Sequence, residues 1–156
     1  MPTSKRENIL GSVEARLKTI TVVNGYRNTV QPGSVRRVVA PPPGIHEFPS
    51  LFVIAGQEEA LVGPEGGPIG LITYKLTVTV EGWVKGTPEA LPGKVEGLLH
   101  DLRKAMLADY THGGYAYETD DLGAEAPVLS DAGEGIAIVR NAWMIWYRTL
   151  YGDPSV

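Results

Sequence analysis

The longest regular pattern of apolar and polar residues lies at positions 71–86, in the stretch LITYKLTVTVEGWVKG. Successive side chains of a β-strand point to opposite faces of its sheet, so this alternation predicts a strand. One face should lie on the core, and the other should meet water, a neighbouring subunit or another polar partner. The core-facing residues are Ile72, Tyr74, Leu76, Val78 and Val80, and the polar-facing residues are Thr73, Lys75, Thr77, Thr79 and Glu81.

Two other segments repeat their apolar residues at helical spacing. The first begins after Ser4, which forms the Ser-x-x-Glu pattern of a capping box with Glu7. We expect this helix to end at VNGYRN, residues 23–28. The second begins near Pro92 and ends at DYTHGG, residues 109–114. The apolar stripes are Ile9, Leu10, Val13, Leu17 and Ile20 in the first helix, and Val95, Leu98, Leu99, Leu102 and Met106 in the second.

Three more runs favour strands. Leu51 to Ile54 form a continuous apolar run between a proline and a glycine. Val35 to Val39 form a β-prone run inside the proline-rich segment 31–49, and proline confines such a strand to a sheet edge because it lacks a hydrogen-bond donor. The C-terminal stretch 135–151 is apolar on both faces, so a helix should cover one side, and another element or a neighbouring subunit the other.

The order of these segments indicates the fold class. Strands that follow one another through short turns favour antiparallel pairing, and the two amphipathic helices need a sheet to bury their stripes. We therefore expect one α+β domain over residues 1–156. It should contain a mainly antiparallel sheet of about four to five strands with two packed helices.

Composition narrows the function classes. The chain has 18 acidic and 14 basic residues spread along its length, for a net charge of −4, and lacks the basic cluster that tight nucleic-acid binding requires. It has no cysteine, which excludes disulfides, thiolate zinc sites and cysteine nucleophiles. The charged N-terminal stretch MPTSKRENILGSVEARLKTI is unlike a signal peptide or a membrane span, so we expect no membrane association.

The candidate chemical residues form no recognisable motif. His46, His100 and His112 lack the i, i+4 pairing of helical metal sites, although His100 adjoins Asp101. The glycine-rich stretch GPEGGPIG, residues 63–70, has no following Lys-Ser or Lys-Thr and leads into a strand, which indicates a turn instead of a phosphate loop. We therefore expect no catalytic residues, no cofactor and no metal, and not an enzyme.

Two clusters of acidic residues also form no recognisable motif. Glu58 and Glu59 adjoin each other, and a second group lies at residues 118–125. Counted as an EF-hand loop from Glu118, that second group places Leu122 and Leu129 where oxygen ligands belong. A solvated acidic loop is the simpler interpretation, and a small metal- or ligand-binding module stays open as an alternative. The second group consists of Glu118, Asp120, Asp121 and Glu125.

Five residues are candidates for contact with a partner. Arg36 and Arg37 on the predicted edge strand can pair with acidic groups of another chain, or can block unwanted strand pairing. Trp143, Trp146 and Tyr147 on the C-terminal strand are expected to divide between the core and a subunit interface, since aromatic residues are enriched in both.

Taken together, these segments resemble the tail terminator and minor tail (tail-completion) proteins of long-tailed bacteriophages. The matching stretches cover most of the chain, and the likeness lies in their order. The proline-rich stretch APPPGIHEFP departs from the pattern because it is longer than the family's connection. The matching stretches are an amphipathic helix ending in NGY, then FPSLFVIAGQEE, LTVTVEGWVKG, KVEGLLHDLRKAMLAD and a final aromatic strand ending in WYRTLY.

The resemblance implies a structural virion protein. Such subunits form a ring, commonly of six copies, on the head-proximal end of the tail tube, where they stop polymerisation of the tube protein and meet the head connector. DNA passes through the lumen without specific binding. The resemblance implies assembly in the host cytoplasm and a final place in the virion tail; a head-completion or connector (neck) protein is the alternative within the same class.

Overall fold

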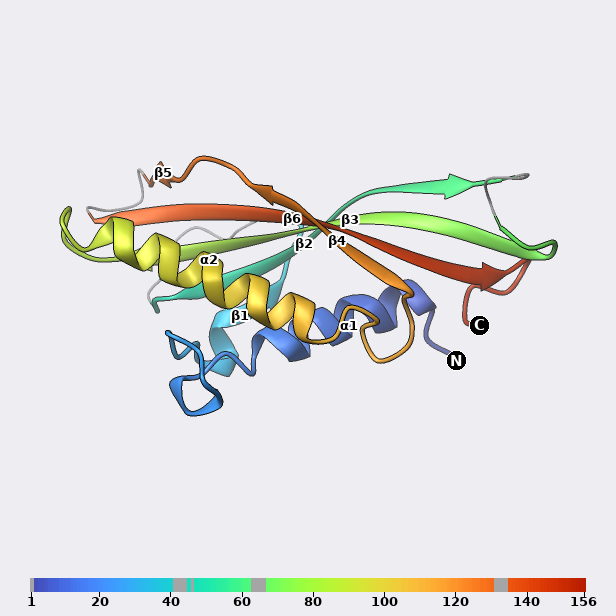
Figure 1. Ribbon diagram of the computed structural model, residues 1–156, viewed down its shortest axis with the longest axis horizontal. Coiled ribbons are helices and arrows are strands. Elements are labelled where there is room, and N and C mark those ends of the chain that lie inside the picture. The colour runs from blue at the N-terminus through green and yellow to red at the C-terminus, as the bar shows by residue number, and fades with distance from the viewer. Residues whose placement is uncertain (1, 41–44, 46, 63–66, 131–134) are drawn as a thin grey trace.

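The alternating segment forms β3 (Leu71–Lys85), one of two 15-residue strands that run the length of the molecule. Its antiparallel partner is β6 (Ile136–Leu150), and the pairing is unbroken from Leu71 opposite Leu150 to Lys85 opposite Ile136. In the computed structural model, which describes residues 2–40, 45, 47–62, 67–130 and 135–156, these two strands form the centre of the sheet (Figure 1).

The sheet has six strands and is mixed. β2 (Ser50–Leu61) pairs antiparallel with β3, β4 (Glu118–Ala124) pairs antiparallel with β6, and β5 (Val128–Leu129) continues along β6 beyond β4. The edge strand β1 (Val35–Arg37) runs parallel to β2. The expected α+β class and mainly antiparallel sheet are confirmed, whereas the expected count of four to five strands was too low. The strand order is β1-β2-β3-β6-β4.

Both helices lie on one face of this sheet (Figure 1). α1 (Lys5–Leu17) and α2 (Leu91–Ala108) bury their apolar stripes in one core cluster that includes Leu76, Val78 and Val80 of β3. The even-numbered face of β3 is thus the core face in its central part, as the alternation predicted. We call this side of the sheet the helix face.

α1 begins as expected and ends earlier. The hydroxyl of Ser4 accepts a hydrogen bond from the backbone N–H of Glu7 (3.2 Å), which confirms half of the capping box. The helix ends at Leu17, and a 3-10 turn, η1 (Val22–Asn24), follows. The β-branched run TITVV, residues 19–23, lowers helix propensity, and the Thr19 hydroxyl donates to the carbonyl oxygen of Arg16 (2.6 Å). A second 3-10 turn, η2 (Pro32–Ser34), precedes β1.

The other face of the sheet, which we call the open face, carries the odd-numbered residues of β3 and the even-numbered residues of β6. No helix among the described residues covers it. The alternation predicted a polar face that meets water or a partner, but parts of this face are buried within the chain. Thr73 and Glu81 are buried, and Phe52, Trp83 and Ile136 form a second apolar cluster at one end.

The acidic segment at 118–125 does not form the expected solvated loop. Most of it is β4, which pairs with β6 from Glu118 opposite Trp146 to Asp121 opposite Trp143. The pairing shifts by a bulge between Asp121 and Ala124, where Gly123 adopts a left-handed backbone with φ of 91°. A long central strand needs hydrogen-bond partners on both sides, and this requirement outweighs the weak strand propensity of the acids.

Two predicted features fall partly on positions that the structure does not describe. His46 and residues 41–44 of the proline-rich stretch lie outside the described residues, as do residues 63–66 of the glycine-rich stretch.

The two ends of the chain lie close together, because the backbone N–H of Lys5 donates to the carbonyl oxygen of Pro154 (3.0 Å) (Figure 1). None of the described helices is long and apolar enough to cross a membrane.

Candidate functional site

The three aromatic residues proposed for an interface divide between the two faces of β6. Trp143 and Tyr147 point to the helix face and are 0% and 3% exposed, so both belong to the core of a single chain. Only Trp146 lies on the open face, where its side chain is partly exposed. A partner can therefore contact Trp146, but not Trp143 or Tyr147 in this fold.

Tyr147 explains one of the acidic pairs. Its hydroxyl donates to Oε2 of Glu58 (2.6 Å), and Arg6 of α1 lies 3.5 Å from the same carboxylate. Burial and the bond to Glu58 both raise the pKa of the Tyr147 hydroxyl. Tyr74 stacks on Tyr147 with ring centroids 5.1 Å apart. Glu58 thus has a structural role, and Glu59 is exposed opposite Lys75.

Trp146 is held on the open face by polar contacts. Its indole N–H donates to Oδ2 of Asp120 (2.9 Å), and the Nζ of Lys75 lies 4.6 Å from its ring centroid. An aromatic ring fixed between a carboxylate and an ammonium group presents a preformed surface, because its rotamer needs no further ordering on contact.

The middle of the open face is only partly covered. Thr77 and Thr79 of β3 and Ala142 and Met144 of β6 are all partly exposed. These side chains are short or flexible and carry no charge. They form a shallow, mildly polar strip beside Trp146, a surface suited to a protein partner and unsuited to holding a small substrate.

The two edges of the sheet carry opposite charge. At the β1 edge, Arg36 lies on the open face and Arg37 on the helix face, where Arg37 pairs with Glu7 of α1 at 2.6 Å. At the β4 edge, Glu118 and Asp120 lie on the open face, opposite Trp146 and Met144. Neither of these carboxylates has a cationic partner within 4.0 Å among the described residues.

One ion pair on the open face, in which only the carboxylate is buried, was not apparent from the sequence. Glu81 is 2% exposed, and its carboxylate accepts from Nε of Arg140 (2.7 Å) and from the indole N–H of Trp83 (2.7 Å). The hydrogen bond to Glu81 and its charge raise the pKa of Arg140. Alternation placed Glu81 on the polar face, yet only the pairing of β3 with β6 sets Arg140 opposite it.

The two described histidines lie apart. His112 is buried, and its Nε2–H donates to the hydroxyl of Thr119 (2.9 Å), because that hydroxyl donates to the carbonyl oxygen of Tyr110 (2.7 Å). Burial lowers the pKa of His112 to about 4. His100 lies on the exposed side of α2, with Nδ1 3.3 Å from Oδ1 of Asp101. His112 is enclosed by the fold, whereas His100 lines a hollow on the surface of α2.

The described part of the chain contains no cluster of side chains that could bind a metal ion. No group of three or more His, Asp or Glu side chains there converges on a point that could hold an ion. Asp121 faces α2 and pairs with Arg103 (3.1 Å), whereas Glu118 and Asp120 point to the open face. Strand alternation therefore separates the acids that the EF-hand count placed together.

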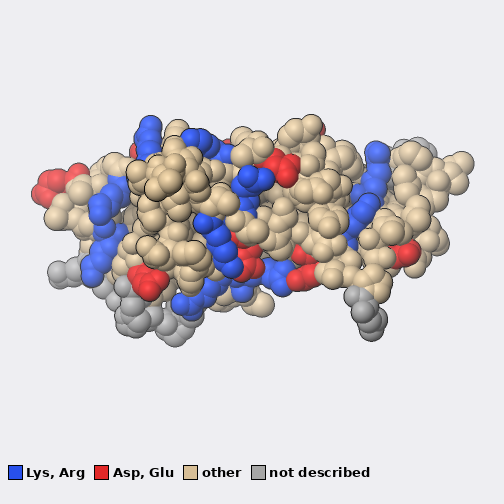
Figure 2. All heavy atoms as spheres, turned by 90° about the horizontal axis from the view of Figure 1, so that it is seen from below, with Lys and Arg blue, Asp and Glu red and all other residues tan. Residues whose placement is uncertain are grey.

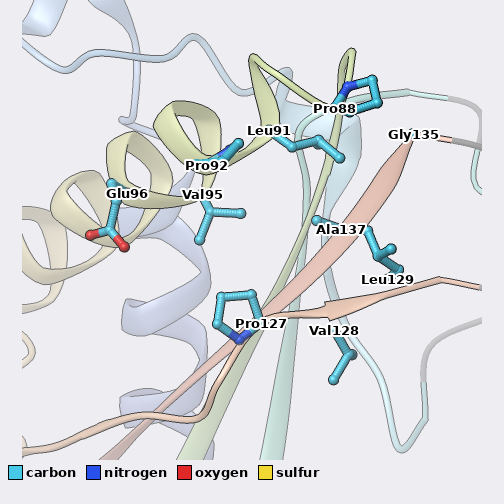
Figure 3. Close-up of a pocket in the computed structure, with 10 residues that line it drawn as sticks. All are labelled: Pro88, Leu91, Pro92, Val95, Glu96, Pro127, Val128, Leu129, Gly135 and Ala137. Atoms are coloured by element: carbon cyan, nitrogen blue, oxygen red, sulfur yellow. The ribbon is translucent and has the colours of Figure 1, made fainter.

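An apolar cavity of about 500 Å³ lies between the first turn of α2 and the β5 segment (Figure 3). Its lining includes Leu91 and Val95 of α2 and Pro127, Val128 and Leu129 of the β5 segment (Figure 3). Glu96 supplies the one charged side chain among the lining residues. No sequence pattern indicates this cavity, since it joins segments that are some 30 positions apart in the chain.

Charged side chains of both signs are mixed on one side of the molecule. Figure 2 shows the molecule from below, with Lys and Arg interspersed with Asp and Glu instead of gathered into one basic stripe. A duplex-binding surface needs clustered cations that neutralise successive phosphates. This side of the molecule does not present such a cluster.

With this geometry established, the chain was compared with known proteins. No protein-family model matches it, and the comparison with curated proteins finds no match. The functional conclusion therefore depends on the order of the elements and on the surfaces described above. Of those surfaces, the open face with Trp146 and the two charged edges are the ones suited to protein contact.

Proposed function

We propose that this protein is a tail terminator subunit of a long-tailed bacteriophage. It forms a ring of about six copies on the head-proximal end of the tail tube, ends polymerisation of the tube protein and provides the joint to the head connector. The observation that carries the proposal is the order of elements: a helix, three strands, a second helix, two shorter strands and a long aromatic strand, which the chain combines in one α+β fold.

The surface chemistry supports a role in assembly. A ring requires heterologous contacts, in which one patch of a subunit meets a different patch of the next. The subunit carries distinct patches at its β1 and β4 edges, and a sheet face that no described helix covers. A chain of net charge −4 does not bind DNA tightly, which suits a lumen through which DNA passes.

Electron microscopy of tail tubes tests the proposal. Purified protein carrying a small gold label is added to tail tubes that lack their terminator, and the position of the label is recorded. We expect one label cluster at a single end of each tube and an arrest of further tube growth. Label distributed along the tubes or absent from them contradicts the proposal, and label that instead binds purified connectors supports the head-completion alternative.

The apolar cavity favours a second candidate function, the binding of a small apolar ligand. Its lining between α2 and the β5 segment is almost entirely apolar and its volume suits a ligand of modest size. A ligand that binds only the native state raises the unfolding temperature, and the stabilisation grows with the logarithm of its concentration relative to Kd. A thermal-shift series with short fatty acids and aromatic alcohols decides this candidate, with Val95→Trp, which fills the cavity, as the control.

A further inference from the structure

The two edges of the sheet are complementary to each other in charge, in face and in strand direction. We infer that the β1 edge of one copy pairs with the β4 edge of the next, so that Arg36 meets Glu118 and Asp120 of the neighbouring copy. This inference rests on the proposed ring and specifies the contact that closes it.

Charge is the first argument. Arg36 is exposed, and its only described partner is the carbonyl oxygen of Gly33, at 3.3 Å from Nε. Glu118 and Asp120 are exposed and have no ion pair among the described residues. Two β1 edges repel each other because both are positively charged, and two β4 edges repel each other because both are negatively charged. A β1 edge and a β4 edge attract each other. The charges thus select a head-to-tail contact over a symmetric dimer.

The faces also agree. Arg36 lies beside Phe52 on the open face, and Glu118 and Asp120 lie beside Trp146 and Met144 on the same face. The strand registers place Arg36 level with Arg140 of β6, four residues from Met144, so Arg36 meets the acids of the next copy when the ring axis is inclined to the strands. When one sheet continues into the next about such an axis, its open face continues into the neighbour's open face. Side chains of opposite charge then become cross-strand neighbours, a pairing that stabilises a sheet.

Strand direction permits the same contact. β1 is parallel to β2, and β4 is antiparallel to β6, which runs in the direction of β2 because both are antiparallel to β3. β1 and β4 therefore point in opposite directions, so the pair formed between copies is antiparallel.

The backbone of β1 is open for such a pair. The N–H of Val38 donates to the carbonyl oxygen of Val53 (3.0 Å), so the backbone groups of Arg37, one residue earlier, point away from β2. The strand order likewise leaves the outer side of β4 without a neighbour among the described strands. Each edge can accept a strand from another chain.

Charge reversal tests the inference on the full chain. The variants are Arg36→Glu, the double variant Glu118→Lys/Asp120→Lys, and Glu89→Lys as a control on the exposed turn before α2. Arg37 is left unchanged because it pairs with Glu7. The mass of each is followed by light scattering against concentration, and circular dichroism checks that each remains folded.

We expect each edge variant alone to need a concentration about tenfold higher, or more, for half-assembly, because like charges then face each other. An equimolar mixture of the two edge variants restores assembly, since each now complements the other and an even-numbered ring closes by alternation. Glu89→Lys assembles as the unchanged protein does.

Three results overturn the inference. If the edge variants assemble like the unchanged protein, the edge charges only protect the strands and the ring closes elsewhere, which leaves the proposed function standing. If the mixture fails although each variant is folded, Arg36 does not meet Glu118 and Asp120. If the unchanged protein never associates, the edge contact and the self-assembling ring both fail.

Discussion

Asp101 joins the second helix to the segment that follows the first. Its carboxylate is 0% exposed and accepts from the backbone N–H groups of Arg27 (3.0 Å) and Asn28 (2.8 Å) and from the side-chain amide of Asn28 (2.8 Å). A buried acceptor with three donors holds that segment on the helix, because each unpaired donor would carry a desolvation penalty.

Removal of this carboxylate should be costly. We expect Asp101→Ala to lower the free energy of unfolding by about 3 kcal/mol, because three donors lose their acceptor. Urea denaturation measures the change. Glu96→Ala, on the exposed side of the same helix, should stay within about 0.5 kcal/mol of the unchanged protein. Equal effects of the two substitutions would show that the Asp101 bonds do not stabilise the fold.

His112 makes stability depend on pH. Its pKa falls from 6.5 in the unfolded chain to about 4 in the fold, so its contribution is complete above pH 6.5 and is lost as the pH falls towards 4. Between pH 7.5 and pH 5 we expect a loss of about 2 kcal/mol from this residue. Asp109, its charged neighbour, has a lowered pKa and stays ionised over this range.

Unfolding in urea at the two pH values measures this loss. His112→Asn is the matched variant, since Asn tolerates the left-handed backbone at this position, where φ is 49°. The variant should be less stable at pH 7.5 but should show a smaller fall towards pH 5. A fall of the same size in both proteins would mean that other groups cause the pH dependence.

At the scale of elements, the approach of α2 to the sheet depends on Gly82 of β3. A Cβ at this position would lie 2.6 Å from Cδ2 of Leu98 and 3.2 Å from Cγ2 of Val139. We expect Gly82→Ala to destabilise the protein by about 2 kcal/mol through overpacking. In a Leu98→Ala background the same substitution should cost less, and a double-mutant cycle of unfolding free energies measures the difference.

Gly11 provides the opposite case within α1. It is exposed, and a Cβ there would meet no atom within 4 Å. We expect Gly11→Ala to stabilise the protein by about 1 kcal/mol, because glycine is a poor helix residue. A thermal melt should show the rise in unfolding temperature. Loss of stability would mean that α1 has a conformational or packing requirement at this position that its geometry does not reveal.

The helices and the long strands were predictable because each has a sustained period. Of the two charged edges of the sheet, only the β1 edge was predictable from the sequence. Arg36 lies in a proline-flanked run whose edge position follows from proline chemistry, whereas β4 consists of acids and a glycine with weak strand propensity. Its pairing with β6 is a tertiary effect that no local pattern encodes.

Alternation also separated the aromatic residues correctly and left their roles undecided. Trp143 and Tyr147 lie an even number of positions apart and share one face of β6, whereas Trp146 lies on the other. Both faces are apolar in sequence, so the pattern could not indicate which face the helices cover. The ion pair of Glu81 and Arg140 could not be predicted from the alternation either, because cross-strand partners depend on the register of the two strands.

At the scale of the whole molecule, the subunit combines a core closed on one side with an open sheet face and two unlike edges. Charge on either edge protects a monomer from unwanted strand pairing, whereas opposite charges on the two edges also let a closed ring use each edge once per subunit. The fold thus provides two different surfaces, and the proposed ring requires that copies of the chain associate through them.

The mass of the unchanged protein in solution tests this self-association most directly. Light scattering measures the mass over a wide concentration range, and electron microscopy images any large species. We expect the mass to rise from the 16.8 kDa of one chain to a plateau near about 100 kDa, with closed rings in the images. A protein that stays at 16.8 kDa at every concentration, or that stops at a symmetric dimer, would contradict the ring.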